Sequence, residues 1–258
     1  MTTIDIVNLK GGTGKTTTAA NMATILAEDY GYRVVLIDAD AQANSTSLFL
    51  PGQKDLNDLS LLMDEGGYNA DFIYNTAYPN LSIVPASINL NSFDLHLAGT
   101  DRWNTLLSSI SNFCDTLRQD GDVDYVIIDC PPSFSLACIS AIMASDEVII
   151  PIKLDKYSFT GLRYLTKQIE QMQQEFPTLK IRGGLITSYY SNSLNIEAAA
   201  ALRQAAHVPI FKQVIRRSPK ADESTWADEP VCQFSRTSAA GRDYRKFVLE
   251  YLRGEAGR

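Results

Sequence analysis

Short runs of apolar residues alternate along the chain with longer stretches that have the periodicity of amphipathic helices. Five runs are continuous blocks rich in Val, Ile and Leu, at residues 4–9, 34–37, 81–84, 125–128 and 148–152. Residues 185–187 and 209–214 predict two more strands. Because the blocks are continuous rather than alternating, they predict strands that are buried on both faces, as in a parallel sheet.

Helices are predicted at residues 15–29, ending near Gly31, and at residues 158–175 and 194–206. Alternating strands and helices are joined by right-handed crossovers, which place helices on both faces of a sheet. The sequence therefore predicts an α/β fold with a mostly parallel, twisted sheet flanked by helices on both faces. Residues 50–80 are polar and rich in Gly and Asn, and predict a surface excursion with a short helix. We find no linker or internal repeat, and interpret residues 1–258 as a single domain.

The composition is that of a soluble globular protein, with 45% hydrophobic and 21% charged residues among 258. No apolar run reaches the length of a membrane span, and no signal peptide is recognisable. The four cysteines form no C-x-x-C pair, which argues against zinc and a disulfide framework and is typical of a reducing cytoplasm. Cys130 and Cys138 are expected to be small core residues, and His96 and His207 to be structural.

The net charge of −7 argues against a nucleic-acid-binding protein until the distribution of charge is considered. Residues 201–258 hold 11 Lys and Arg against 7 Asp and Glu, whereas residues 1–200 hold 12 against 23. This asymmetry allows a basic patch on an acidic protein. Composition alone favours an ordinary solvated surface.

The segment Lys-Gly-Gly-Thr-Gly-Lys-Thr-Thr at residues 10–17 lies between the first predicted strand and the first predicted helix. Glycines let a chain curl tightly, so that backbone N–H groups at a helix N-terminus point toward a phosphate chain. Lys15 can then reach the β- and γ-phosphates, and the Thr16 hydroxyl can ligate Mg²⁺. The pattern G-x-x-x-x-G-K-[ST] fails because residue 9 is Leu. The form K-G-G-x-G-K-[ST]-T fits, with a second lysine, Lys10, at its start.

Carboxylates follow two of the predicted strands. Asp38 and Asp40 come after the strand at residues 34–37, and Asp129 comes after the strand at residues 125–128. Ligands of parallel α/β sheets bind at this edge, and such an Asp beside a phosphate loop holds Mg²⁺ through its water ligands. Each Asp alone could equally cap a helix. The neighbouring loop favours the ligand site.

These motifs resemble the ParA/MinD group of P-loop ATPases with a deviant Walker A loop, and most of all the short, Soj-like ParA partition proteins. Residues 38–46 are similar to the ParA segment D-x-D-x-Q-x-N-x-T, and residues 131–133 to the Pro-Pro-Ser that follows the Walker B Asp. The similarity continues through residues 144–162 and into the last helix, from Tyr244 to Glu250.

The resemblance implies an ATPase that uses Mg²⁺ and works as an ATP-dependent homodimer. Two monomers close face to face, and Lys10 reaches the phosphates of the partner molecule. Lys15 and the backbone of the loop hold phosphates in cis, while Asp40 activates the attacking water. The implied Mg²⁺ residues are Thr16, Asp38 and Asp129. The implied phosphate-binding residues are Lys10, Gly11, Gly12, Thr13, Gly14, Lys15, Thr16 and Thr17.

The resemblance also implies an adenine site and a surface for non-specific double-stranded DNA. The implied adenine residues are Thr187, Ile215, Arg216 and Ser218. The implied DNA-binding residues are Arg216, Arg217, Lys220, Arg242, Arg245 and Lys246. The sequence departs from the family where Arg216 replaces Pro, Ser218 replaces Asn and Asn192 replaces an Arg. The implied partners are DNA, a second copy and a ParB-like centromere-binding protein, in a cytoplasmic and nucleoid-associated setting.

Four other functions compete with DNA partition. A MinD-like membrane ATPase would use residues 244–253 as a free amphipathic helix, but packing of this helix on the core is favoured. An iron–sulfur relative would need two suitably placed cysteines per subunit. A tyrosine kinase of the same group would carry a tyrosine-rich tail, which residues 254–258 lack. A non-enzymatic nucleotide-binding scaffold remains, although Asp40 argues against it.

Overall fold

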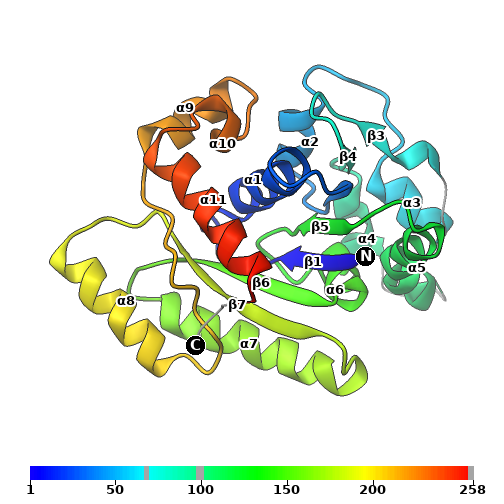
Figure 1. The fold of residues 1–258 in the computed structure, drawn as a ribbon. Coiled ribbons are helices and arrows are strands. Elements are labelled where there is room, and N and C mark those ends of the chain that lie inside the picture. Colours follow the sequence, from blue (N-terminus) through cyan, green and yellow to red (C-terminus); the bar gives the residue numbers. More distant parts are fainter. Residues whose placement is uncertain (67–69, 97–101, 255–258) are drawn as a thin grey trace.

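The computed structural model describes residues 1–66, 70–96 and 102–254. Within these residues, seven strands form one sheet in the order β3-β4-β2-β5-β1-β6-β7 (Figure 1). All neighbouring pairs are parallel except β3 with β4, which is antiparallel. The strands are β1 Thr2–Ile6, β2 Val34–Asp38, β3 Tyr74–Asn75, β4 Leu81–Val84, β5 Tyr125–Asp129, β6 Glu147–Lys153 and β7 Lys180–Thr187. The predicted fold class is confirmed.

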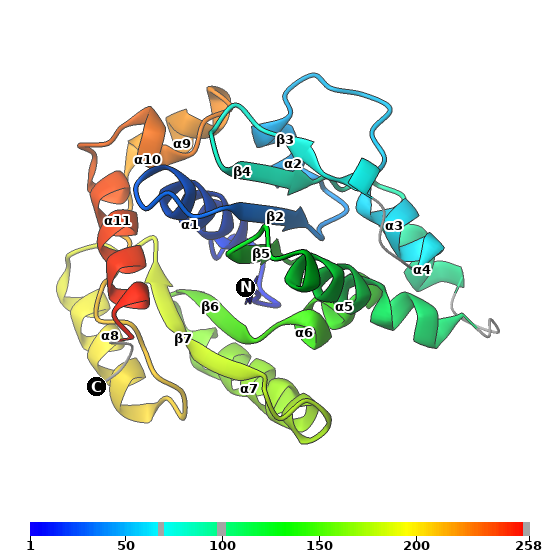
Figure 2. The same cartoon turned by 45° about the vertical axis from the view of Figure 1, so that its right-hand side comes forward.

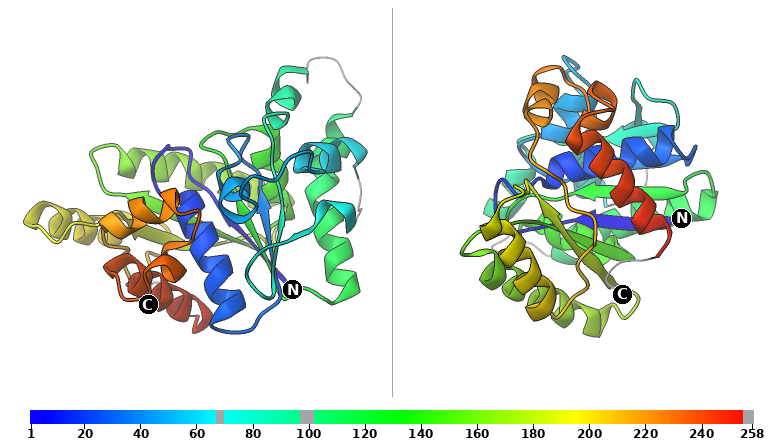
Figure 3. Two further views of the ribbon diagram at one scale, coloured as in Figure 1. Left: turned by 90° about the horizontal axis from the view of Figure 1, so that it is seen from above. Right: turned by 60° about the vertical axis from the view of Figure 1, so that its left-hand side comes forward.

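Helices cover both faces of the sheet (Figure 2). They are α1 Lys15–Glu28, α2 Asn44–Phe49, α3 Leu59–Glu65, α4 Leu90–His96, α5 Trp103–Asp120, α6 Leu136–Ala144, α7 Ser158–Glu175, α8 Ser193–Ala205, α9 Pro219–Trp226, α10 Val231–Phe234 and α11 Ala239–Leu252, with a short 3₁₀ turn, η1, at Ala70–Phe72. One core lies between the sheet and α1, α10 and α11, and the other between the sheet and α3, α5, α6 and α7. Both views in Figure 3 show α11 beside α1, although the two helices come from opposite ends of the sequence.

The alternation of side chains along β1 explains why the two cores form. Ile4 and Ile6 are fully buried on the side of α1, whereas Val7, the residue just after the strand, is buried on the opposite side. All residues of β2, and all residues of β5 except the half-buried Tyr125, are buried, as continuous apolar blocks require. The positions of the predicted strands at residues 34–37, 81–84, 125–128 and 148–152 are thereby confirmed to within one residue at each end.

The strand predicted at residues 209–214 is not present. The segment makes only one isolated bridge of its own, between Ile210 and Gly184 of β7. The backbone N–H groups of Lys212 and Gln213 donate instead to the Glu250 carboxylate on α11, at 2.7 and 2.8 Å. A side chain from another element therefore takes the donors that a sheet ladder would need.

The segment at residues 50–80 is more than a surface excursion. It contains the predicted short helix, α3, but Leu59, Leu62 and Met63 of this helix are fully buried. Their spacing places them on one helical face, which packs in the core beside α5. The segment also supplies β3, the antiparallel edge strand, which the sequence analysis did not predict.

The expectations for the cysteines and for the last helix are confirmed. Cys130 and Cys138 are fully buried. In α11, Phe247, Val248 and Tyr251 are buried in the core with α1. His207 lies in the turn between α8 and the following segment, and the side chain of His96 lies outside the described residues.

The core holds one carboxyl group in an unfavourable place. Asp5 of β1 is fully buried, and neither of its oxygens accepts a hydrogen bond from a nitrogen or oxygen donor of the described residues. Burial raises the pKa of Asp5 from 3.8 to about 7, and the nearby Cys130 thiol, a weak donor, opposes the rise. The ionised carboxylate therefore destabilises the fold.

Replacing Asp5 with Val should raise the free energy of unfolding, more at high than at low pH. A raised carboxyl pKa means that stability is retained while the group is protonated and falls as the pH rises from 3.8 toward 7. A folded-state pKa that is higher by one corresponds to about 1.4 kcal/mol of stability lost once the group is ionised. Urea denaturation of Asp5→Val and wild type, each at about pH 5 and about pH 8, measures the difference.

Thr3→Val is the matched control for Asp5→Val. Thr3 is also fully buried in β1, and apart from the nearby Cys114 thiol its hydroxyl lacks a partner among the described residues, but it does not titrate near neutral pH. Its replacement should change stability equally at both pH values. A gain from Asp5→Val that does not depend on pH would contradict the raised pKa.

Candidate phosphate-binding site

The glycine-rich loop joins β1 to α1 and curls around open space. Gly12 and Gly14 have φ angles of 70° and 84°, a left-handed conformation that glycine adopts without strain. A Cβ atom at Gly11 or Gly12 would meet nothing within 4 Å. Gly14 is the N-cap of α1, and no side chain caps the helix. The first backbone N–H groups of α1 are therefore free to bind an anion.

Two lysines of the loop have different surroundings. Lys15 is only 7% exposed, and its Nζ donates to the backbone oxygen of Lys10 at 3.3 Å. Burial lowers the pKa of Lys15, and the negative charges of Asp129 and Asp40 oppose this. Lys10 is more exposed, and its Nζ forms an ion pair with Asp155, just before α7. Lys15 thus points into the site, while Lys10 is held at its margin.

Asp38 and Asp129 are register partners at the carboxyl ends of β2 and β5. Both are fully buried. Asp38 Oδ2 accepts hydrogen bonds from the backbone N–H and the hydroxyl of Thr46, each at 2.8 Å. Asp129 Oδ2 accepts from the Ser45 hydroxyl at 2.8 Å. These bonds from α2 fix the orientation of both carboxylates.

Burial raises the pKa of both carboxyl groups, and the charge of Asp129 raises that of Asp38 further. The Thr16 hydroxyl lies near Asp129 and opposes the rise of its pKa. Asp129 Oδ1 is buried and has no hydrogen-bond partner among the described residues. A hard cation with oxygen ligands would satisfy this oxygen and offset the repulsion. The described residues contain no cluster of three His, Cys, Asp or Glu suited to a metal, so a cation here would need further oxygens from a hydroxyl, from water or from a bound ligand.

Asp40 lies on a different side of the site. Its backbone N–H donates to Asp38 Oδ1 at 3.2 Å, and its own Oδ1 accepts from the Gln42 N–H at 3.0 Å. The carboxylate of Asp40 borders a cavity of about 200 Å³ that Pro131 and Ser133 also line. Asp40 thus makes no side-chain hydrogen bond to α2 among the described residues, and it lines a space between the segments that follow β2 and β5. It does not cap the helix α2, whose N-cap is Ala43.

A second cavity, of about 240 Å³, lies beyond the loop. We refer to it as the nucleoside cavity. It brings together all the residues predicted to contact adenine: its walls include Thr187, Ile215, Arg216 and Ser218, next to Gly12 and Gly14. Thr187 also braces the loop, because its hydroxyl donates to the Thr13 oxygen at 2.7 Å.

Four of the six residues predicted to bind DNA are paired with acidic side chains. Arg216 makes two hydrogen bonds of 2.8 Å to the buried Asp243. The other pairs are Arg217 with Asp222, Lys220 with Glu223 and Arg245 with Asp29. The other two, Arg242 and Lys246, are exposed one turn apart on α11 and form no ion pair within the described part of the chain.

Sequence reasoning missed the residues that orient the others. Ser45, Asp155 and Asp243 belong to none of the recognised motif positions, and Thr46 is only the last residue of the segment D-x-D-x-Q-x-N-x-T. Thr46 had a signal in the sequence, because its spacing from Asp38 is that of the motif. No signal in the sequence identifies Asp155 or Asp243, since they meet Lys10 and Arg216 only in the folded chain.

Comparisons with known proteins agree with this arrangement. Residues 1–181 match the family described as "AAA domain". The chain is 34% identical over 257 residues to the chromosome partitioning protein ParA of Caulobacter vibrioides, covering 98% of this chain and 94% of the relative. It is 32% identical over 251 residues to the sporulation initiation inhibitor protein Soj of Bacillus subtilis, covering 96% of each chain.

Solved structures show the same P-loop NTPase fold. One is cobyrinic acid a,c-diamide synthase from Mycobacterium smegmatis with bound ADP and magnesium, at 26% identity and a TM-score of 0.79, covering 98% of this chain and 95% of the other. Another is the septum site-determining protein MinD from Pyrococcus horikoshii complexed with Mg-ADP, at 25% identity and a TM-score of 0.75, covering 96% and 95%. Among the described residues, no helix is long and apolar enough to span a membrane.

Replacing Thr46 with Val should lower the free energy of unfolding by about 1–3 kcal/mol, because the buried Asp38 carboxylate loses a hydrogen bond. The Thr46 hydroxyl also accepts from the Ala86 N–H at 2.8 Å, which would lose its acceptor. Urea denaturation measures the change. Thr46→Ser should retain most of the stability. Ser47→Ala, at an exposed position of the same helix, should change it by less than about 0.5 kcal/mol; equal losses at both positions would refute the role of Thr46.

Proposed function

Because the chain belongs to the ParA/MinD family of P-loop ATPases, we propose that it hydrolyses ATP and couples the reaction to DNA partition. Residues 1–258 would act as one unit that binds ATP and magnesium, closes into a homodimer, binds DNA without sequence preference, and reopens after hydrolysis. The observation that carries the proposal is the convergence of the loop at residues 10–17 with Asp38, Asp40 and Asp129 at one edge of the sheet.

The residues present fit magnesium and ATP. The free N–H groups at α1 and the Lys15 ammonium suit the phosphates, and the nucleoside cavity suits adenosine. The Thr16 hydroxyl would ligate magnesium directly, and Asp38 and Asp129 would orient its water ligands; the unpartnered Asp129 Oδ1 supports this. Bound magnesium neutralises phosphate charge and makes the terminal phosphorus more electrophilic. Lys15 would hold the leaving diphosphate oxygens.

Asp40 would act as the general base. Asp40 lines the cavity between the segments that follow β2 and β5, its negative charge acts on Lys15 of the loop, and the backbone N–H of Gln42 holds its carboxylate in place. In hydrolysis, an oxygen of water bonds to the γ-phosphorus, the bond from phosphorus to the bridging oxygen breaks, and Asp40 accepts or directs the proton of the water. The products are ADP and phosphate.

Lys10 would act on the ATP of the partner molecule. In the monomer it is turned aside and paired with Asp155. The pair joins two side chains that are each more than a third exposed, so releasing it costs little. In the dimer, Lys10 would leave the single carboxylate of Asp155 and contact the phosphates of the ATP bound to the second copy. This supports a dimer that forms only when ATP is present.

DNA would be bound through exposed basic side chains on and near α11. Phosphate contacts need charge rather than base-edge geometry, so the binding would be independent of sequence. The exposed partners of Arg217 and Lys220 can be exchanged for phosphates at little cost, whereas Asp243 is buried and holds Arg216. We therefore expect Arg242 and Lys246 to contribute more than Arg216 and Arg245.

The remaining parts of the proposal follow from the family. A ParB-like centromere-binding protein would stimulate hydrolysis, and the ATP-bound dimer would be cytoplasmic and associated with the nucleoid. Membrane binding through the last helix is not proposed, because the apolar face of α11 packs in the core. The experiment that tests the whole proposal compares DNA binding with an ATP analogue, with ADP and without nucleotide. Equal binding in all three states would refute it.

Asp40→Ala should slow ATP hydrolysis by about 10²-fold or more, the usual effect of losing a general base. ATP binding should persist, because Lys15, Thr16 and the loop N–H groups remain. Phosphate release and nucleotide affinity measure the two effects. A variant that hydrolyses ATP at the wild-type rate would exclude Asp40 as the base.

Lys10→Ala should retain ATP binding and lose the ATP-dependent dimer. Lys15→Ala is the contrasting control, and should weaken ATP binding at least about tenfold because a charged hydrogen bond in cis is lost. Asp155→Asn should release Lys10 and allow dimers at lower protein concentration. Sedimentation with a non-hydrolysable ATP analogue measures all three variants; a normal dimer of Lys10→Ala would contradict a role in trans.

The double variant Arg242→Glu with Lys246→Glu should weaken DNA binding equally for all sequences. Each lost phosphate contact should flatten the slope of log K against log salt by about 0.9. The variant Arg217→Glu with Lys220→Glu changes the same charge and should also weaken binding, but by less, because each of these side chains must first exchange an acidic partner for a phosphate. An unchanged slope in the variant Arg242→Glu with Lys246→Glu would mean that DNA binds to a surface other than α11.

A further inference from the structure

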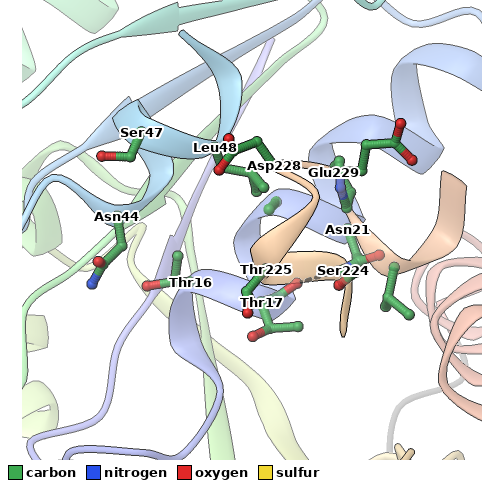
Figure 4. Close-up of a pocket in the computed structure, with 13 residues that line it drawn as sticks. Thr16, Thr17, Asn21, Asn44, Ser47, Leu48, Ser224, Thr225, Asp228 and Glu229 are labelled. Carbon is green, nitrogen blue, oxygen red and sulfur yellow. Dashed lines mark hydrogen bonds between the residues drawn. The ribbon is translucent and has the colours of Figure 1, made fainter. Parts of the chain in front are cut away.

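Two of the cavities in the described part of the chain have a volume of about 330 Å³ each. One is bordered by Thr16 and Thr17, as Figure 4 shows, and therefore belongs to the proposed nucleotide site. The other lies between α7 and α8, two helices that pack on the face of the sheet opposite α1 (Figure 1). We refer to it as the α7–α8 cavity. No residue that lines it also lines the nucleoside cavity or the cavity beside Asp40.

The walls of the α7–α8 cavity are mostly apolar. Phe159 and Leu162 line it from α7, and Leu202 and Ala205 line it from α8. Only Ala199 and Leu202 of α8 are buried, and the small side chains of this alanine-rich helix leave space next to α7. Folded proteins contain few apolar voids of this size, because empty space forfeits packing contacts. The volume and the apolar lining are typical of sites for small molecules.

Two side chains with N–H donors also line the α7–α8 cavity, Arg163 from α7 and His207 from the turn after α8. Both residues are exposed, which places them at its opening. Neither side chain makes a hydrogen bond or an ion pair with another residue that the structure describes; Arg163 contributes only its backbone oxygen, which accepts from the Thr166 hydroxyl at 3.1 Å. A guanidinium and an imidazole without partners, at the opening of an apolar space, suit an anion with an apolar body.

The charge around the α7–α8 cavity is positive, although the chain carries a net charge of −7. Lys167 lies one turn after Arg163 on α7, and Arg203 lies near the end of α8. Both are exposed, and neither forms an ion pair within the described ranges. The acidic side chains of the two helices do not line the cavity; they are Glu170, Glu175 and Glu197. This local excess of positive charge attracts an anion.

We propose that the α7–α8 cavity binds a small organic carboxylate with a compact apolar body. The body would lie against Phe159, Leu162 and Leu202, where it is removed from water. The carboxylate would accept two hydrogen bonds from the Arg163 guanidinium and one from the His207 ring. The apolar walls select against inorganic phosphate and nucleotides, whose polar surfaces would lose water there without gaining partners. The proposal depends on neither ATP hydrolysis nor DNA binding.

The test uses the full chain and naphthoate, a fused pair of aromatic rings with one carboxylate. The chain has two histidines, so His96→Gln leaves His207 as the only imidazole. The NMR signals of this ring should shift saturably with added naphthoate, with a dissociation constant of about 1 mM or lower. Naphthylmethanol has the same rings without the charge, and should bind at least about tenfold more weakly. Signals of His207 that do not shift, or equal affinities for the two compounds, would overturn the proposal.

Calorimetry on the chain with both histidines tests the charge of Arg163. Arg163→Gln should weaken naphthoate binding at least about tenfold, because the paired hydrogen bonds to the carboxylate are lost. Lys167→Gln removes the same charge one turn later on α7, from a residue that does not line the cavity, and should change the affinity by less than about twofold. Equal losses in both variants would mean that naphthoate responds to the general charge of α7, and would overturn the proposal.

A second pair of variants tests the space itself. Ala205→Phe places a large side chain in the α7–α8 cavity and should abolish detectable binding of naphthoate. Ala201→Phe adds the same side chain one turn earlier on α8, at a residue that does not line the cavity, and should leave the affinity within about twofold of wild type. Both alanines are exposed, so neither change disturbs the core. Binding that survives Ala205→Phe would place the anion outside the cavity and overturn the proposal.

Discussion

The pairing of β2 with β5 places two fully buried carboxylates, Asp38 and Asp129, side by side at the end of the sheet. Removing charge from water and placing like charges together are both costly, so the neighbouring structure must compensate. α2 does so with the hydroxyls of Ser45 and Thr46, and α1 does so with Lys15. The turn after β2 and the loop after β1 are arranged around these two groups. Asp129 Oδ1 accepts no hydrogen bond from the described residues, and this uncompensated oxygen favours a bound cation.

The central strands and the loop could be predicted because their signals are local. Continuous apolar blocks identify strands such as β2 and β5 whatever their neighbours, and the glycines of residues 10–17 dictate the turn that they form. Residues 209–214 are equally apolar, yet Glu250 takes two of their backbone donors. That carboxylate comes from the far end of the chain, and nothing in the local pattern indicates it. The helices α5 and α6 were likewise not predicted as elements, although their apolar faces build one of the two cores.

In the candidate site, too, some positions can be predicted from the sequence and others cannot. The positions of Lys15, Asp38 and Asp129 follow from the order of strand, loop and helix, and the structure brings them together. The acidic partners of Lys10, Arg216 and Arg245 do not follow, because each lies far away in the sequence. The excess of Lys and Arg after residue 200 allows a basic patch, but Asp243 and Asp29 neutralise Arg216 and Arg245 from within the fold. Net charge of a segment is thus a poor measure of the charge that its surface presents.

Asp155 has two functions that do not interfere with each other. One carboxylate oxygen pairs with Lys10, while the other accepts from the Tyr157 N–H and the Ser158 hydroxyl at the start of α7, each at 3.0 Å. When Lys10 departs, the start of α7 therefore keeps its hydrogen bonds and no backbone has to move. Rotation of one exposed lysine takes nanoseconds or less, far faster than the collective motions of domains. If the protein dimerises as proposed, the release of Lys10 would therefore not limit the rate, and the encounter of the two monomers would.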